Sequence, residues 1–322
     1  IDPHVVHNPQ VSEALGLSFE ALFEFDQDTR PYSVKPLLLA KMPVFSEGNK
    51  TVTFELKKGI HFADHEIFNG EKRELKAKDV VHNILRMCDP KIPSAIFWAF
   101  DNMIVGLNDW RTKNYQAEIT DYSVLPLGLE VLDDYHFQIH LTQPYPQLFK
   151  VLSLPASAIV APETVGLSNL QIGGTGPYQI SISKDAEESN PHSKKNWVFH
   201  RNENYHAELP HVATVEYVAF SDADKAKEAY IFGNIDILPL TREIKSFFTG
   251  VKKGDEAQSQ TPTLLEQFQK EHSIIQRDKL DVVYLSFNHK NPVIKNAGVE
   301  FRKAISMAIA VSYTHLRAHE TA

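Results

Sequence analysis

Cysteine is almost absent from this sequence, because Cys88 is the only one in 322 residues. A single thiol excludes an intramolecular disulfide and a cysteine-rich zinc site. Cys88 lies at the end of a segment whose apolar residues have helical spacing. We therefore expect it to be a small buried residue of the core.

Long apolar runs and an excess of positive charge are also missing. No run approaches the roughly 20 apolar residues that a membrane-spanning helix needs. The formal net charge is −8, so the chain lacks the basic surface of nucleic-acid-binding proteins, and we expect no nucleic-acid partner. With 43% hydrophobic and 23% charged residues, the composition is that of a globular protein long enough for two domains.

The order of apolar and polar residues predicts a mixed α/β chain with more than one domain. In the first half, residues 51–59 alternate like a half-buried strand, residues 76–90 have helical spacing, and residues 129–141 have the pattern of a hairpin. In the second half, strands and helices follow one another. The expected elements are strands at 212–220 and 282–288 and helices at 222–234 and 298–310. For the helix at 222–234 we expect Asp222 or Ser221 as the N-cap and Gly233 just past the end.

The glycine-rich stretch QIGGTGPYQI at 171–180 has the composition of a phosphate-binding loop but not its pattern. Such a loop needs converging backbone N–H groups and a helix directly after it. Here Gly176 precedes Pro177, which has no N–H, and the following residues alternate like a strand. The stretch is therefore predicted to be a turn that leads into a strand.

The sequence has 15 histidines, which makes a metal site worth testing. His61, Asp64 and His65 are close together, but a catalytic zinc site needs two histidines on one helical turn with a glutamate, or three convergent ligands. Asn69 stands where the second histidine of the helical pattern would be. We expect no metal, and a metal-dependent hydrolase that uses the turn at 61–65 is kept as the alternative function.

Several stretches occur in an order that one protein family shares. They are DPH at 2–4, VTFELKKGIHFAD at 52–64, LKAKDVVHNILRMCDP at 75–90, GTGPY at 174–178, NWVFHRNENYH at 196–206 and LSFNHKNPVIKNAGVEFRKAISMAI at 285–309. Together they resemble the extracellular solute-binding proteins of peptide transporters, family 5. The resemblance extends over about residues 1–310.

This resemblance implies an α/β fold of the two-lobed periplasmic-binding-protein type (type II), with an extra small α+β domain and a truncated C-terminal lobe. The implied first lobe consists of residues 1–24 and 156–278, the small inserted α+β domain of residues 25–155, and the start of the incomplete second lobe of residues 279–310. Residues 311–322 resemble a translated sequencing adapter, and we expect them to be an artefact. We also expect the chain to be a fragment without its signal peptide.

The resemblance further implies which residues line the ligand cleft. These are His7, Asn8 and Pro9 after the DPH motif, Phe97 or Trp98 after the helix at 76–90, and Asn288 at the end of the expected strand. Two interpretations of Trp98 stay open, because a ring in the stretch IFWAF could also belong to the core. A peptide of any sequence must be held mainly by its backbone, with open pockets for its side chains.

The implied function is that of the substrate-binding component of an ATP-binding-cassette importer, which is not an enzyme and needs no cofactor. It would capture peptides between two lobes and deliver them to a membrane permease. Oligopeptides are favoured because residues 101–111 resemble an insertion of oligopeptide-binding members. The protein is expected to be a monomer, periplasmic or extracellular and membrane-anchored.

Overall fold

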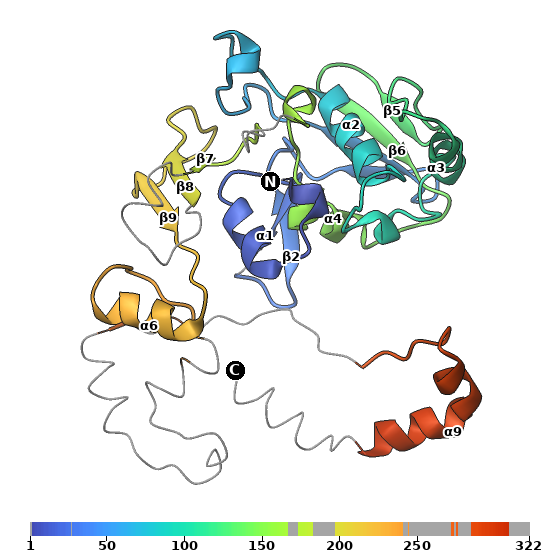
Figure 1. Cartoon of the computed structure of the whole chain (residues 1–322). Coiled ribbons are helices and arrows are strands. Elements are labelled where there is room, and N and C mark those ends of the chain that lie inside the picture. Colours follow the sequence, from blue (N-terminus) through green and yellow to red (C-terminus); the bar gives the residue numbers. More distant parts are fainter. Residues whose placement is uncertain are drawn as a thin grey trace. The chain divides into compact units, whose positions relative to one another are not determined.

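The computed structural model describes residues 2–26, 28–166, 173–182, 197–240, 244, 272–273, 275 and 285–308. The chain divides into two compact units, Ile1–Ala226 and Lys227–Ala322 (Figure 1). The three sheets found among the described residues all lie in the first unit.

A four-stranded antiparallel sheet carries most of the core of the first unit. Its strands, in spatial order, are β3 (Val44–Ser46), β4 (Thr51–Glu55), β6 (His136–His140) and β5 (Leu129–Val131). Phe54 and Phe137 are register partners on β4 and β6, and their rings stack with centroids 4.6 Å apart. The strand predicted within 51–59 and the hairpin predicted at 129–141 are confirmed.

Helix α2 (Ala77–Met87) packs on β5 and β6 (Figure 1). At its start the backbone N–H of Lys76 donates to the Asp79 carboxylate at 2.8 Å, which satisfies a free N–H at the helix N-terminus. Cys88 at its end is fully buried, and burial raises the pKa of its thiol. The helix and the buried cysteine predicted from the sequence are both confirmed.

Shorter elements complete this part of the first unit. Phe149 stacks on Phe23 with ring centroids 4.9 Å apart and so joins a hairpin to the core. The elements are the strands β1 (Phe23–Asp26) and β2 (Ser33–Pro36), the helices α1 (Pro9–Leu15), α3 (Leu107–Gln116) and α4 (Leu148–Val151), and the 3₁₀ turns Pro3–Val5, Glu66–Phe68, Phe97–Ala99, Pro155–Ser157 and Pro162–Thr164.

A second, three-stranded antiparallel sheet lies beside helix α1. Its order is β7 (Tyr178–Ile182), β8 (Trp197–Arg201) and β9 (Thr214–Tyr217). Tyr178 and Phe199 pack against Ala14 of α1 in a buried cluster of their own, so the N-terminal segment packs against residues that are far away in the sequence. The strand predicted at 212–220 is confirmed in a shorter form, while the division into a lobe and an inserted domain stays a prediction.

The glycines before β7 let two backbone segments approach each other closely. A Cβ on Gly174 would lie 2.1 Å from the carbonyl oxygen of Ser18, and one on Gly176 would lie 2.6 Å from its carbonyl carbon. The backbone N–H of Gly176 donates to the same oxygen at 3.0 Å. Neither glycine has a positive φ, so the lack of space, and not the backbone conformation, requires glycine here. The predicted turn before a strand is confirmed.

Glu20 joins this glycine segment to the end of the second sheet. Its buried carboxylate accepts hydrogen bonds from the hydroxyls of Thr175 (2.9 Å) and Tyr205 (2.7 Å) and pairs with Nε2 of His206 (2.8 Å). Burial and the charge of Glu20 raise the pKa of Tyr205, so the phenol keeps its proton and donates. The GTGPY and NENYH stretches therefore meet at one carboxylate.

Helix α6 (Ala223–Ile231) begins in the first unit and ends in the second. Asp222 accepts a hydrogen bond from the backbone N–H of Lys225 at 2.9 Å, and Gly233 follows the helix with a φ of 71°. Both features are typical of helix ends. The helix predicted at 222–234 is confirmed, including its cap.

Helix α9 (Pro292–Ala308) is the main described element of the second unit. It starts six residues before the predicted helix at 298–310, and Gly298, with φ 74° and ψ −173°, interrupts its helical geometry. Of the strand expected at 282–288, residues 285–288 are not in a strand. The rest of that strand, and the expected artefact at 311–322, lie outside the described residues.

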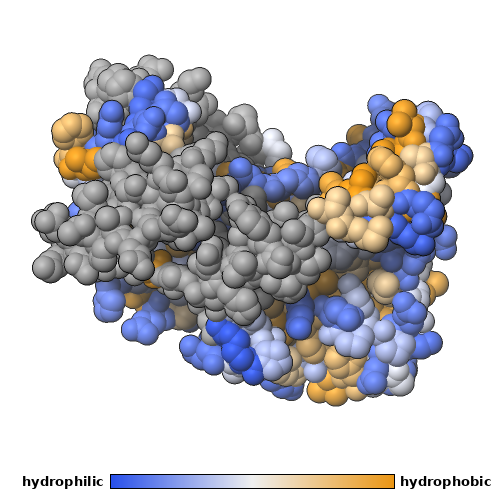
Figure 2. Space-filling model, turned by 90° about the horizontal axis from the view of Figure 1, so that it is seen from below, coloured by the Kyte–Doolittle hydropathy of each residue, from blue (hydrophilic) through white to orange (hydrophobic). Residues whose placement is uncertain are grey.

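The surface alternates between polar and apolar side chains. Figure 2 shows orange hydrophobic patches among blue hydrophilic ones on the face seen from below. Several large apolar side chains are exposed, among them Tyr115, Ile119 and Leu127 of the first unit.

Within the described part of the chain, no helix combines the length and the apolar character that crossing a membrane requires.

Candidate ligand-binding site

The N-terminal segment is fixed by a buried ion pair. The carboxylate of Asp2 accepts two hydrogen bonds from the guanidinium of Arg86 in α2, one of them 2.9 Å long. The side chain of His4 is completely buried and contacts both Arg86 and the segment of Ala158. Its Nδ1 lies 2.6 Å from the Arg86 guanidinium, and its Nε2 lies 2.9 Å from the carbonyl oxygen of Ala158. Since an arginine only donates, Nδ1 accepts and Nε2 carries the proton.

The charges of this cluster are set by burial and by Arg86. Burial, together with the Arg86 cation, lowers the pKa of His4 to about 4, so the imidazole is neutral at pH 7. Burial alone would raise the pKa of Asp2, but the hydrogen bond and the charge of Arg86 outweigh it and keep this pKa below its usual value. The cluster therefore contains one anion, one cation and one neutral ring.

The predicted ligand residues His7, Asn8 and Pro9 follow this anchor directly. Asn8 is the N-cap of α1, and its side-chain oxygen accepts from the backbone N–H groups of Gln10 (3.0 Å) and Val11 (3.1 Å). Pro9 is the first residue of the helix, and His7 is exposed in front of it. The Asn8 oxygen thus caps the helix, which sequence reasoning missed. A role for these residues in ligand binding stays a prediction.

The second predicted segment is hydrogen-bonded to the first. The backbone N–H of Ala95 donates to the carbonyl oxygen of His4 at 2.9 Å. Phe97 is the first residue of a 3₁₀ turn and packs against the core. The guanidinium of Arg111 lies 3.8 Å from the centre of its ring. Trp98 is 70% exposed, and its indole N–H donates to the carbonyl oxygen of Ala95 at 3.2 Å. The interpretation of Trp98 as a core residue is therefore wrong.

Asn288, the remaining predicted residue, belongs to the second unit. It is exposed, and its side-chain oxygen accepts from the backbone N–H of Lys290 at 3.0 Å. This bond stabilises the turn that precedes α9. The part of Asn288 in ligand binding stays a prediction.

The histidine-rich turn at 61–65 does not provide a metal site in the described part of the chain. No group of three or more histidine, cysteine, aspartate or glutamate side chains could hold a metal ion there. Nδ1 of His65 is occupied, because it accepts from the backbone N–H of Ile67 at 3.0 Å. The alternative of a metal-dependent hydrolase has no support in this geometry.

Sequence reasoning did not find Arg86 or Glu20, on which the two anchoring clusters depend. Both are charged residues in apolar stretches of the sequence. Arg86 directly follows Leu85, and Glu20 comes two residues before Leu22. That setting is a usable signal, because buried charges are rarely without a partner. The partner itself could not be predicted, since Asp2 lies 84 residues from Arg86.

The family model for bacterial extracellular solute-binding proteins, family 5 (middle), matches residues 33–312. The chain belongs to this family. The sequence is 29% identical to the glutathione-binding protein GsiB of Salmonella typhimurium and 27% identical to that of Escherichia coli K12, each over 185 residues. These matches cover 56% of this chain and 29% of each relative, so the chain aligns with less than a third of these relatives' length.

Solved structures show the same fold. A structure of the pheromone receptor PrgZ matches with a TM-score of 0.59 at 19% identity, covering 77% of this chain and 46% of that one. Peptide-bound OppA of Listeria monocytogenes matches with a TM-score of 0.56 at 18% identity, covering 73% of this chain and 44% of that one. The chain therefore has the α/β fold of the two-lobed solute-binding proteins, as the sequence predicted.

Proposed function

We propose that this chain is part of the substrate-binding component of an ATP-binding-cassette importer and that the protein captures peptides between two lobes. Membership of family 5 over residues 33–312 carries the proposal. The relatives named GsiB bind glutathione, and a similar solved structure holds a peptide. Glutathione is itself a γ-linked tripeptide, so both comparisons support a short peptide as the ligand. Oligopeptides are the ligands we favour.

The N-terminal segment and the segment of Trp98 offer the kind of surface that such a ligand needs. The bond between His4 and Ala95 brings the segment of His7 close to the segment of Trp98. An exposed indole provides a flat apolar face on which many different side chains can pack, and a peptide of any sequence would be held mainly through its backbone. The ion pair of Asp2 and Arg86 fixes the start of the N-terminal segment and leaves the exposed side chains of His7 and Trp98 unoccupied by it.

The mechanism follows from a division of contacts between two lobes. In the proposed organisation, residues 1–24 and 156–278 form the first lobe, residues 25–155 form the inserted domain, and the second lobe begins at residue 279 with Asn288 near the cleft. A peptide that binds both lobes favours the closed form by the difference between its affinities for the closed and open forms. The membrane permease would then recognise the closed form. The protein is proposed to act as a periplasmic or extracellular, membrane-anchored monomer.

Calorimetry on the complete protein tests this proposal. Glutathione and oligopeptides of two to eight residues are titrated into the wild type and into Trp98→Ala. If the ring packs on the ligand, the variant loses about 1–3 kcal/mol of binding free energy, or about 5-fold to 150-fold in affinity. Its melting temperature stays unchanged, because Trp98 is 70% exposed.

Tyr115→Ala is the matched control, since Tyr115 is also an exposed aromatic residue of the first unit, at 75%. It should change neither affinity nor melting temperature. The absence of binding for every peptide by the complete protein would refute the proposed function. A Trp98→Ala variant that melts early and binds normally would refute the site.

A further inference from the structure

Exposed apolar side chains of the first unit gather in one short segment. Half of the large apolar side chains that are exposed among the described residues of this unit lie within residues 115–132. The three most exposed of them are in this segment, namely Leu127 at 84%, Ile119 at 80% and Tyr115 at 75%. Single exposed apolar residues are common, but a concentration of them indicates an interaction surface.

The segment runs alongside helix α3. Asn114, near the end of the helix, accepts through its side-chain oxygen from the backbone N–H of Asp121 at 2.8 Å. A Cβ on Gly106, which precedes the helix, would lie 3.7 Å from the Cβ of Leu127. Residues 121–127 are therefore antiparallel to α3 over about 12 Å, at 1.5 Å per helical residue. Figure 1 shows α3 at the end of the four-stranded part that lies away from β7, β8 and β9.

Contacts with the core hold this segment in place. The indole N–H of the buried Trp110 donates to the carbonyl oxygen of Val124 at 2.8 Å. The backbone N–H of Gly128 donates to the carbonyl oxygen of Val105, also at 2.8 Å. Both bonds use backbone groups and leave the apolar side chains exposed, so the surface is formed before any partner binds and little ordering opposes binding. We call the following residues the α3 strip: Tyr115, Ile119, Val124, Leu125 and Leu127.

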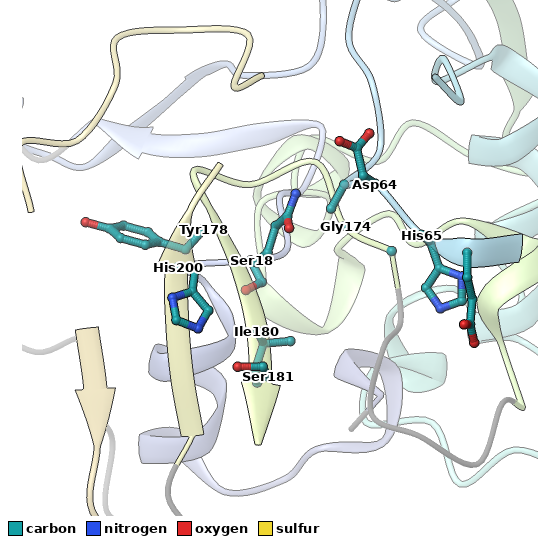
Figure 3. Close-up of a pocket in the computed structure, with 12 residues that line it drawn as sticks. Ser18, Asp64, His65, Gly174, Tyr178, Ile180, Ser181 and His200 are labelled. Atoms are coloured by element: carbon teal, nitrogen blue, oxygen red, sulfur yellow. The ribbon is translucent and has the colours of Figure 1, made fainter. Parts of the chain in front are cut away.

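The exposure of the α3 strip suits a macromolecule better than a small ligand. Small molecules usually bind in hollows that enclose them. One hollow, of about 250 Å³, lies beside β7, and Figure 3 shows Ser181 and His200 on one side of it and Asp64 and His65 on the other. The residues of the α3 strip are not part of its lining. Their side chains are 39–84% exposed, so a partner has to cover them from outside.

The charges along the α3 strip are mainly negative. Four of the five exposed charged residues at 107–132 are acidic. They are Asp109, Glu118, Asp121 and Glu130, against Lys113. A second copy of the chain would bring the same carboxylates close to them, and an anionic lipid surface would be repelled as well. The complementary partner has apolar side chains next to lysines and arginines.

We propose that the α3 strip is the docking surface for a basic amphipathic helix of another protein. The apolar residues i, i+4 and i+8 of such a helix span about 12 Å, which is the length over which the segment follows α3. Basic residues beside this apolar stripe lie toward Asp109 and Glu118. The strip does not include Trp98, so this inference goes beyond the proposed function and does not depend on it.

The test titrates a fluorescent peptide with the 322-residue chain and follows the anisotropy. The probe is an amphipathic helix of about 14 residues built from leucine, lysine and alanine, with leucine at every third or fourth position. It should bind in a saturable manner and more weakly as the salt concentration rises. A peptide of the same composition in scrambled order, and an analogue with glutamate in place of lysine, should each bind at least tenfold more weakly.

The variant Ile119→Ser/Leu127→Ser locates the binding site. It removes two side chains of the strip and should weaken binding roughly tenfold or more. Its melting temperature should stay that of the wild type, because both side chains are at least 80% exposed. The matched control Leu209→Ser/Val212→Ser changes two exposed apolar residues elsewhere in the first unit and should bind like the wild type.

A charge reversal tests the acidic side chains. Glu118→Lys should weaken binding of the lysine peptide, whereas Glu208→Lys, which reverses another exposed glutamate, should not. Trp98→Ala should leave the affinity unchanged, which separates this surface from the proposed peptide site. In a spectrum of the ¹⁵N-labelled chain, the shifted backbone amides should be those of residues 107–132.

Several results would overturn the proposal. Equal affinity of the wild type and Ile119→Ser/Leu127→Ser would place the peptide elsewhere, and equal binding of the glutamate analogue would remove the role of charge. Sedimentation that shows a dimer of the wild type, lost in Ile119→Ser/Leu127→Ser, would make a second copy the occupant. Binding to anionic vesicles that the same variant abolishes would make it a lipid surface.

Discussion

Replacement of the buried His4 by glutamine should remove a specific part of the acid sensitivity of this fold. His4 is fully buried, donates from Nε2 to Ala158 and accepts at Nδ1 from Arg86. Glutamine also offers one donor and one acceptor, but it does not titrate. The change therefore tests the protonation of the ring and keeps the hydrogen-bonding pattern.

The magnitude follows from the difference between the unfolded and folded pKa values of this histidine. The pKa is 6.5 for a histidine in an unfolded chain and about 4 for His4 in the fold. Between these values the unfolded chain binds a proton that the folded chain does not bind, so the free energy of unfolding falls as the pH decreases. Each pH unit in this window is worth about 1.4 kcal/mol, which amounts to about 3 kcal/mol by pH 4. The stability is fully present above pH 6.5.

The neighbouring groups titrate in ways that the experiment can separate. The pKa of Asp2 is lowered from 3.8, so its contribution is present above pH 3.8 and is lost only below it. The pKa of His82 is lowered by burial and by Arg86, which adds a loss in the same direction as that of His4. Because His82 is present in both proteins, its effect cancels when His4→Gln is compared with the wild type.

Urea denaturation at pH values from 7 to 4, followed by tryptophan fluorescence, measures the effect. The curve of the wild type should fall by about 3 kcal/mol more than that of His4→Gln. His211→Gln, which changes an exposed histidine, should follow the wild type. Parallel curves for His4→Gln and the wild type would show that His4 titrates normally and would refute this reasoning.

Two further predictions concern the packing of the first unit, and denaturant melts check both. Gly174→Ala should cost about 3 kcal/mol, the upper end of the usual range for overpacking, because its Cβ would lie 2.1 Å from the Ser18 carbonyl oxygen. Gly173→Ala should cost clearly less, since its nearest contact would be 3.3 Å, and equal costs would contradict the steric explanation. Glu20→Ala should cost about 3–5 kcal/mol, because it leaves the buried hydroxyl of Thr175 and the partly buried donors of Tyr205 and His206 without their acceptor. Glu24→Ala, which breaks an exposed ion pair, should stay within about 0.5 kcal/mol of the wild type, and a similar loss in both variants would contradict the role of Glu20.

The local elements could be predicted because their signals lie within a few residues. Alternation in β4 and helical spacing in α2 each place an apolar face against one core, and the structure buries those faces. The cap of α6 is another local signal, since Asp222 and Gly233 act within their own turns. Burial, capping and turn geometry of this kind are properties of a short window of sequence.

The interpretation of Trp98 as a core residue failed because the burial of a ring depends on contacts outside such a window. Trp98 lies in the apolar stretch IFWAF, but the 3₁₀ turn at 97–99 directs Phe97 to the core and leaves Trp98 exposed. Asn8 was placed in the cleft by the family resemblance, which did not indicate that its side-chain oxygen caps α1, and its role in ligand binding stays a prediction. The composition of a segment does not say which of its residues the next turn will bury.

The motifs that carry the resemblance to the family have a structural role in this chain. The DPH stretch supplies the anchor of Asp2 and His4, while the GTGPY and NENYH stretches meet at Glu20. These residues are buried or partly buried and hydrogen-bond to one another, so they hold segments together and leave little capacity for a ligand. The motifs by which the family was recognised are therefore residues that stabilise the fold of the first unit. The ring of Trp98 is not among them and is exposed, so it keeps a free face, and its part in ligand binding stays a prediction.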